Sequence, residues 1–123
     1  MTEWLRKLLL DHATGKTYWT PPVQWYVAYF LGGVEVSGGS YARQPISFAD
    51  AVAATSTVSR AGSSTSQAFE NLPTVDVDEI HIMSAVTGGD AGWVIPHLQS
   101  FTSGDDFGYT PNKIGVGLSG FAG

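Results

Sequence analysis

The acidic side chains that stand closest together are the first candidates for chemistry. Asp76, Asp78 and Glu79 share the segment DVDEIH with His81. Alternating carboxylates can bind a calcium ion through their oxygens, but the spacing and the glycine turn of an EF-hand loop are missing. Acidic residues at the exposed beginning of a strand explain the pattern as well. We therefore predict no metal site in this segment.

The histidines and serines do not form a recognisable catalytic pattern. The histidines are widely spaced, without the HxH or HxxxH pairing typical of zinc ligands. The serines lack the G-x-S-x-G elbow of hydrolases, and a chain without cysteine has no thiolate nucleophile. The residues concerned are His12, His81, His97, Ser63, Ser64 and Ser66. We predict no catalytic residue and no enzymatic activity.

The glycines of the segment GVGLSG, residues 115–120, match the spacing of a dinucleotide-binding loop. That loop works only where a strand leads into a helix whose N-terminus meets the pyrophosphate. Here Ile114, Val116 and Leu118 alternate with small residues, which predicts a strand. We predict no cofactor, and close packing of this strand against another strand or a subunit.

The segment EVSGGSYARQPISF combines a glycine pair, an aromatic residue and a lone arginine. Such a loop can cradle an anion beside Arg43, or it can turn the chain between two strands. We favour the turn, because Gly38 and Gly39 can take the positive backbone angles of a tight connection and Tyr41 can cover the edge of the core. Arg43 would then bridge to a carboxylate such as Glu35, or to a neighbouring subunit.

These candidates must be positioned by a helix that is followed by strands. Thr2 is a candidate N-cap, and apolar residues at helical spacing predict an amphipathic helix over residues 3–12, within an N-terminal helical region 1–15. Two prolines then stop helical structure, and the apolar residues begin to recur with a period of two. Both faces of the strand predicted at 23–31 are apolar, so we expect it to be covered on both sides.

Short alternating segments separated by turn residues predict the rest of the fold. Further strands are predicted at 46–48, 66–69, 79–86, 93–98 and 113–121. The segment TGGDAG is predicted to connect two of them as a hairpin. Residues 49–66 have little apolar periodicity, so we expect a flexible or irregular segment. The predicted fold class is mainly β, an antiparallel β-sandwich of jelly-roll-like type with a short N-terminal amphipathic helix, in one domain over residues 1–123.

Few residues are charged, and the charges are mostly negative. Charged residues make up 14% of the chain, against roughly 25% in ordinary soluble domains. The net charge is −5 with only six Lys and Arg, so we expect no nucleic-acid partner. No apolar run approaches the ~20 residues that span a bilayer, so we expect no membrane partner.

Aromatic and apolar side chains are the candidates for contact with other proteins. Trp4, Leu5 and Leu8 recur on a helix too short to be stable without a docking surface, and Trp25 belongs to the aromatic first strand. Aromatic residues are enriched in cores and at protein interfaces, and exposed ones can also stack on sugars. We expect core and interface contacts, with a host-surface glycan as the alternative partner.

Five segments along the chain resemble a family of small structural proteins of tailed phages, usually described as tail fibre or minor tail proteins. The most distinctive is EVSGGSYARQPISF. The others are WLRKLLLDHATGK, YWTPPVQWYVAYF, DEIHIMSAVTGGDAGWVIPHL and SGDDFGYTPNKIGVGLSG. The chain departs from the family pattern in lacking a Trp before the Gly-Gly hairpin. Pro96, within GWVIPHL, predicts an edge strand at that point.

The resemblance implies a non-enzymatic virion subunit without catalytic residues or cofactor, assembled in the cytoplasm of the bacterial host. It implies partners that are copies of the same chain, for example in a trimer, and neighbouring tail or head proteins. A tail or tail-fibre position is the first expectation. A head decoration or capsid-stabilising protein is the alternative, because low charge and apolar surface suit either position.

Overall fold

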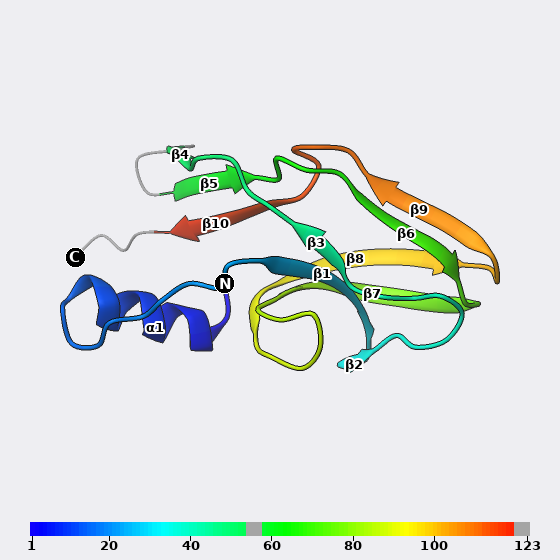
Figure 1. Ribbon diagram of the computed structural model, residues 1–123, viewed down its shortest axis with the longest axis horizontal. Coiled ribbons are helices and arrows are strands. Elements are labelled where there is room, and N and C mark those ends of the chain that lie inside the picture. The colour runs from blue at the N-terminus through cyan, green and yellow to red at the C-terminus, as the bar shows by residue number, and fades with distance from the viewer. Residues whose placement is uncertain (54–57, 120–123) are drawn as a thin grey trace.

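The structure is built mainly from antiparallel strands, which a helix precedes (Figure 1). The computed structural model describes residues 1–53 and 58–119. Within these residues every strand pair is antiparallel, in sheets of five, three and two strands. The predicted fold class, mainly antiparallel β with a short N-terminal helix, is confirmed.

The largest sheet has the strand order β2-β1-β7-β8, and β3 also pairs with β1. Its strands are β1 (Trp25–Leu31), β2 (Val34–Glu35), β3 (Gln44–Ile46), β7 (Val75–Met83) and β8 (Ala91–Phe101). A two-residue turn at Gly32 and Gly33, with φ of 57° and 81°, joins β1 to β2. Positive φ at both positions matches the twist of a tight hairpin. Strands β7 and β8 form the hairpin predicted around TGGDAG, and both extend further from the turn than predicted.

Two smaller sheets hold the remaining strands. One has the order β10-β5-β4, and the other pairs β6 with β9. Their strands are β4 (Val52–Ala53), β5 (Val58–Gly62), β6 (Gln67–Leu72), β9 (Asp105–Tyr109) and β10 (Gly115–Ser119). The segment 49–66 is therefore more regular than predicted, because β5 pairs along the whole of β10, a strand remote in sequence. Residues 54–57 of that segment lie outside the described residues.

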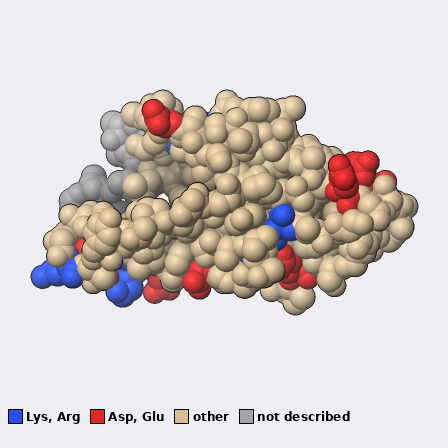
Figure 2. Space-filling model, viewed as in Figure 1, with Lys and Arg blue, Asp and Glu red and all other residues tan. Residues whose placement is uncertain are grey.

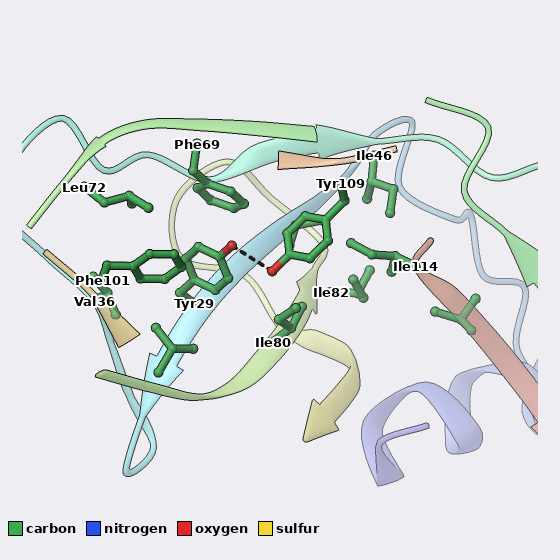
Figure 3. Packing of buried hydrophobic residues seen from close by; sticks show 13 residues of the cluster. Tyr29, Val36, Ile46, Phe69, Leu72, Ile80, Ile82, Phe101, Tyr109 and Ile114 are labelled. Carbon is green, nitrogen blue, oxygen red and sulfur yellow. Dashed lines mark hydrogen bonds between the residues drawn. The ribbon is translucent and has the colours of Figure 1, made fainter. Parts of the chain in front are cut away.

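The core lies between the large sheet and the β6–β9 pair, so the two form the layers of a sandwich (Figure 3). Tyr29 of β1 is fully buried, with its ring centroid 4.3 Å from that of Phe69 in β6 and 5.3 Å from that of Phe101 in β8. Ile80 and Ile82 of β7 belong to the same cluster. Each such side chain contributes about 1.5–3 kcal/mol when it is removed from water.

Helix α1 (Glu3–Ala13) is attached to the large sheet through its first turn. Thr2 caps the helix, its N–H donates to the carbonyl of Gly92 at 2.8 Å, and its hydroxyl donates to the carbonyl of Ala91 at 2.6 Å. Leu5 is buried against β8, where a Cβ at Gly92 would lie 3.1 Å from it. The rest of α1 extends to the end of the molecule opposite β6 and β9 (Figure 1).

Strand β8 ends the strand order of the large sheet, so the edge position predicted from Pro96 is confirmed. The register with β7 shifts by one residue between the pairs Val77 with Gln99 and Glu79 with Pro96, which is a β-bulge. Proline is tolerated at an edge because its missing N–H is not needed by a neighbouring strand, and bulges bend an edge out of a flat ladder.

Candidate functional site

The motif EVSGGSYARQPISF fills a gap along one side of β1. Strand β2 pairs with β1 at Phe30 and Leu31, and β3 pairs with it from Trp25 to Val27. On the side of β1 that faces away from β7, the middle of the strand therefore has no neighbouring strand. There the backbone N–H of Tyr29 donates to the hydroxyl of Tyr41 at 3.1 Å. An unpaired buried N–H is costly, so the side chain of Tyr41 takes the place of a strand carbonyl.

Arg43 joins three segments of the chain through its guanidinium. Its Nε and Nη2 donate to the two carboxylate oxygens of Glu35 at 2.8 and 2.9 Å, a bidentate ion pair. Its Nη1 donates to the carbonyls of Ala85 and Gly88 in the β7–β8 connection at 2.8 and 2.7 Å. We call this arrangement of Glu35, Arg43 and the two carbonyls the clamp. Of the partners that the sequence left open for Arg43, the structure shows Glu35.

The clamp is electrostatically coupled and mostly buried. The Arg43 side chain is 7% exposed and the Glu35 side chain 29% exposed. The hydrogen bonds from Arg43 lower the pKa of Glu35, against the opposing effect of burial, and the bond from the Tyr41 hydroxyl lowers it further. The hydrogen bond with Glu35 in turn raises the pKa of Arg43. A guanidinium that donates four bonds within its own chain acts here as a structural cation.

The glycine pair of the motif brings this loop against the end of β6. Gly38 and Gly39 have φ of 108° and 55°. A Cβ at Gly39 would lie 2.4 Å from the carbonyl oxygen of Asn71, and the next residue, Ser40, donates its N–H to that same oxygen at 2.9 Å. The motif thus touches both the β6 end and the β7–β8 connection, and it acts as an architectural turn.

A second polar chain crosses the core from β1 to β8. The hydroxyls of Tyr29 and Tyr109 are 2.8 Å apart (Figure 3), and the Tyr109 hydroxyl lies 3.2 Å from Nε2 of His97. Burial raises the pKa of both tyrosines, so both remain neutral phenols. Burial also lowers the pKa of His97, which keeps the imidazole neutral at neutral pH. Sequence reasoning missed Tyr109, because aspartates and a glycine break the alternation of DDFGY.

The interface residues predicted from sequence have different environments. Leu5 is 1% exposed and already docks within the chain. Trp25 is half-buried against Trp93, with ring centroids 5.4 Å apart, and Trp4 packs edge-on against Trp19 at 6.3 Å. Leu8 is also half-buried. The most exposed large apolar residues around the helix were not predicted and are Leu10, Tyr18 and Val23.

The acidic and histidine residues of DVDEIH take part in local contacts, one of which joins Glu79 Oε1 and His81 Nε2 at 3.3 Å. Asp76 accepts from the Ser100 hydroxyl at 2.8 Å, and Asp78 accepts from the N–H of Gly32 at 3.2 Å. The His81 ring stacks on Phe30 at 3.7 Å. Within residues 1–53 and 58–119, no three His, Asp or Glu side chains come together as a metal site would require.

Other residues that the sequence offered as candidates for chemistry also make structural contacts. The buried Ser63 accepts the N–H of Asn112 through its hydroxyl at 3.0 Å. The described part of GVGLSG is strand β10, in which the Gly117 carbonyl accepts from the indole N–H of Trp93 at 3.2 Å. Gly120 lies outside the described residues. In the part of the chain that the structure describes, no helix is long and apolar enough to cross a membrane.

Fold and site together describe a small, mainly β protein whose polar contacts hold loops and strands in place. The family model of the podophage GP4 fiber I protein gp80 matches residues 1–116, and the chain belongs to this family. Family membership indicates a bacteriophage virion component with a structural, fibre-associated role. A comparison with the curated proteins finds no match.

Proposed function

We propose that this chain is a non-enzymatic subunit of a phage tail or tail fibre that assembles with copies of itself and with neighbouring virion proteins. The observation that carries the proposal is the match to a fibre protein family over residues 1–116. Assembly takes place in the cytoplasm of the bacterial host before the particle is released. A head decoration protein of the same virion is the alternative position.

The surface around α1 is the proposed contact between copies. Leu10 is 64% exposed, Tyr18 81% and Val23 fully, and all three belong to the helix or to the segment that leads from it to β1. Trp4 and Leu8, which the sequence predicts as interface residues, are half-buried on the same helix. Large apolar side chains that are exposed on a helix and on the segment after it are candidates for a contact with another protein.

The distribution of charge favours contact between unlike ends of two copies. The helical end carries Arg6, Lys7 and Lys16 against Glu3 and Asp11, and Lys7 is paired with Asp11 at 2.6 Å. Glu70 and Asp105 lie on β6 and β9 at the other end. Figure 2 shows basic groups together with acidic groups at the helical end, and acidic groups without basic ones at the opposite end. Contacts between unlike ends are heterologous and close into a ring, such as a trimer, where the rotation allows it.

The oligomeric state in solution tests this contact. Light scattering after size exclusion should give an oligomer for the natural chain, and Leu10→Ala with Tyr18→Ala should shift it toward monomer. Leu98→Ala is the matched control, because Leu98 is 85% exposed but lies on β8. A monomeric natural chain, or a doubly substituted chain that assembles as readily as the natural one, would show the contact to be wrong.

The position on the particle needs a separate experiment. A gold label on this chain, seen by electron microscopy of whole particles, should decorate the tail or its fibres. Label confined to the head would replace the tail proposal by the head decoration alternative.

A further inference from the structure

A groove of about 330 Å³ opens between β10 and the β7–β8 hairpin. Ile80 and Ile95 provide apolar surface in it, and His97, Tyr109, Arg60 and Lys113 provide polar groups. This volume lies at the lower end of the range of about 300–1,000 Å³ for small-molecule sites. Its combination of apolar surface and a few polar groups is also typical of such sites.

The two cations of this groove stand out from the rest of the chain. Of the six Lys and Arg residues, three belong to the helical end and one, Arg43, to the clamp. The remaining two, Arg60 and Lys113, both line the groove. Among the described residues neither is within ion-pair distance of a carboxylate. An acidic protein thus places its remaining positive charge at one small opening.

Arg60 is held in place rather than free in solvent. Its guanidinium lies over Gly115 of the paired strand, where a Cβ would be only 2.3 Å from Nη2. Its Nη1 donates to the side-chain carbonyl of Asn112 at 3.2 Å. Asn112 has a φ of 67°, and the buried Ser63 holds its N–H. The glycine and the turn therefore fix the position of this cation.

The opposite wall supplies neutral hydrogen-bonding groups. His97 and Tyr109 lie at hydrogen-bond distance from each other, and the Tyr29 hydroxyl supports Tyr109 from behind. Neutral imidazole and phenol groups can bind hydroxyls as donors or acceptors. The groove therefore offers a positive side for an anion, a neutral side for hydroxyls and an apolar surface between them.

We propose that this groove binds an acidic sugar residue, that is, a hydroxylated ring that carries a carboxylate. The carboxylate binds Arg60, with Lys113 as the second cation, in the geometry that guanidinium and carboxylate favour. The ring lies on Ile95, and its hydroxyls bind the imidazole of His97, which Tyr109 holds from the core side. A polyphosphate ligand fits less well, because two cations in a chain of net charge −5 cannot compensate many negative charges. This inference goes beyond the proposed structural role and does not depend on the oligomeric state.

Calorimetry with oligomers of galacturonate, alginate and hyaluronan tests the proposal directly. At least one of these probes should bind saturably, and its methyl-esterified form should not bind, because esterification removes the charge and keeps the ring. Arg60→Gln should weaken binding about ten-fold or more, the range for a charge-assisted hydrogen bond. Lys113→Gln should weaken it less, and Lys16→Gln, which removes the same charge at the helical end, should leave it unchanged.

Gly115→Ala provides a test through geometry instead of charge. The added methyl group displaces the guanidinium of Arg60 while every charge is kept, so we expect weaker binding with the far-ultraviolet circular dichroism spectrum of the natural chain. The proposal is overturned if none of the three probes binds, or if the esterified form binds equally. It is also overturned if polyglutamate binds as tightly with the same dependence on Arg60, because the site would then recognise carboxylates without the sugar.

Discussion

At the scale of single residues, Arg43 shows how a nearly buried cation can be an element of architecture. Its bidentate pair with Glu35 fixes the end of β2, and its other donors fix the β7–β8 connection. These two segments are far apart in sequence, so one side chain replaces a set of backbone contacts between loops. Lysine could not do the same, because it lacks the planar fork of donors.

Glu35→Gln should lower the free energy of unfolding by about 2–3 kcal/mol at neutral pH, because the nearly buried guanidinium of Arg43 would lose the carboxylate that neutralises its charge. The folded-state pKa of Glu35 is lowered from its ordinary value of 4.5. The ion pair therefore stabilises fully above pH 4.5 and loses its contribution as the pH falls through the lower folded-state pKa. Denaturant unfolding at several pH values measures this difference.

The matched control for this prediction is Glu70→Gln on the exposed face of β6. A surface carboxylate of this kind should change stability by less than about 0.5 kcal/mol. If Glu35→Gln behaves like Glu70→Gln at neutral pH, the clamp contributes little and our account of it is wrong.

The two hydroxyls of the core should differ in their cost of removal. Tyr109→Phe leaves the fully buried hydroxyl of Tyr29 without its partner and should cost about 1–3 kcal/mol. Tyr29→Phe leaves the Tyr109 hydroxyl bonded to His97 and should cost only about 0.5–1.5 kcal/mol. Chemical denaturation of both variants gives the comparison. Equal losses of stability would contradict the proposed order of hydrogen bonds, from Tyr29 through Tyr109 to His97.

At the scale of elements, the sequence allowed the helix and the strands with regular alternation to be predicted. The first strand, the β7–β8 hairpin and the edge position of Pro96 are found where they were expected. Strands β5 and β9 were missed, because small or charged residues interrupt their alternation and their stability comes from pairing with β10 and β6. Such pairing is not visible in local pattern.

Pairing between strands remote in sequence also explains which parts of the site could be predicted and which could not. Glu35 and Arg43 are close in sequence within a distinctive motif, so their pairing could be anticipated. Arg60 and Lys113 line one groove only because β5 pairs with β10 and the turn before β10 folds back onto Ser63. A signal for this existed in the glycines of GVGLSG, which leave room on the strand for a large side chain.

Gly39→Ala should destabilise the chain more than Gly33→Ala, although both glycines have positive φ. The backbone cost of about 1–2 kcal/mol is common to both positions. At Gly33 a Cβ meets nothing within 4 Å, whereas at Gly39 it lies 2.4 Å from the Asn71 oxygen. Thermal and denaturant unfolding of the pair isolates the contact, and an equal loss would show that the loop moves away from β6 without cost.

At the scale of the whole molecule, stability should be distributed unevenly. The core lies between the large sheet and β6–β9, while α1 is attached mainly through its first turn. Local opening is easiest where few apolar side chains are buried. We therefore expect the backbone amides of the strands to be better protected against hydrogen exchange than those of the helix.

Hydrogen exchange measures this distribution. Amides of Val27 to Tyr29 should exchange slowest, and those beyond Leu10 in α1 much faster. Leu5→Ala should release the helix, so that its amides exchange rapidly while the β1 amides keep their protection. Equal acceleration in β1 would show that helix and sandwich open together, contrary to this expectation.

Pro96 on the edge strand has a consequence for copies held at high local density. Strand β8 spans Ala91–Phe101 and pairs only with β7 among the described residues, so its outer side could template a further strand from another molecule. Proline withholds a donor in the middle of that side, and the adjacent bulge disturbs the ladder. Sheet growth from one molecule to the next, as in amyloid, is thereby discouraged, and crowded copies remain free to associate through their side chains.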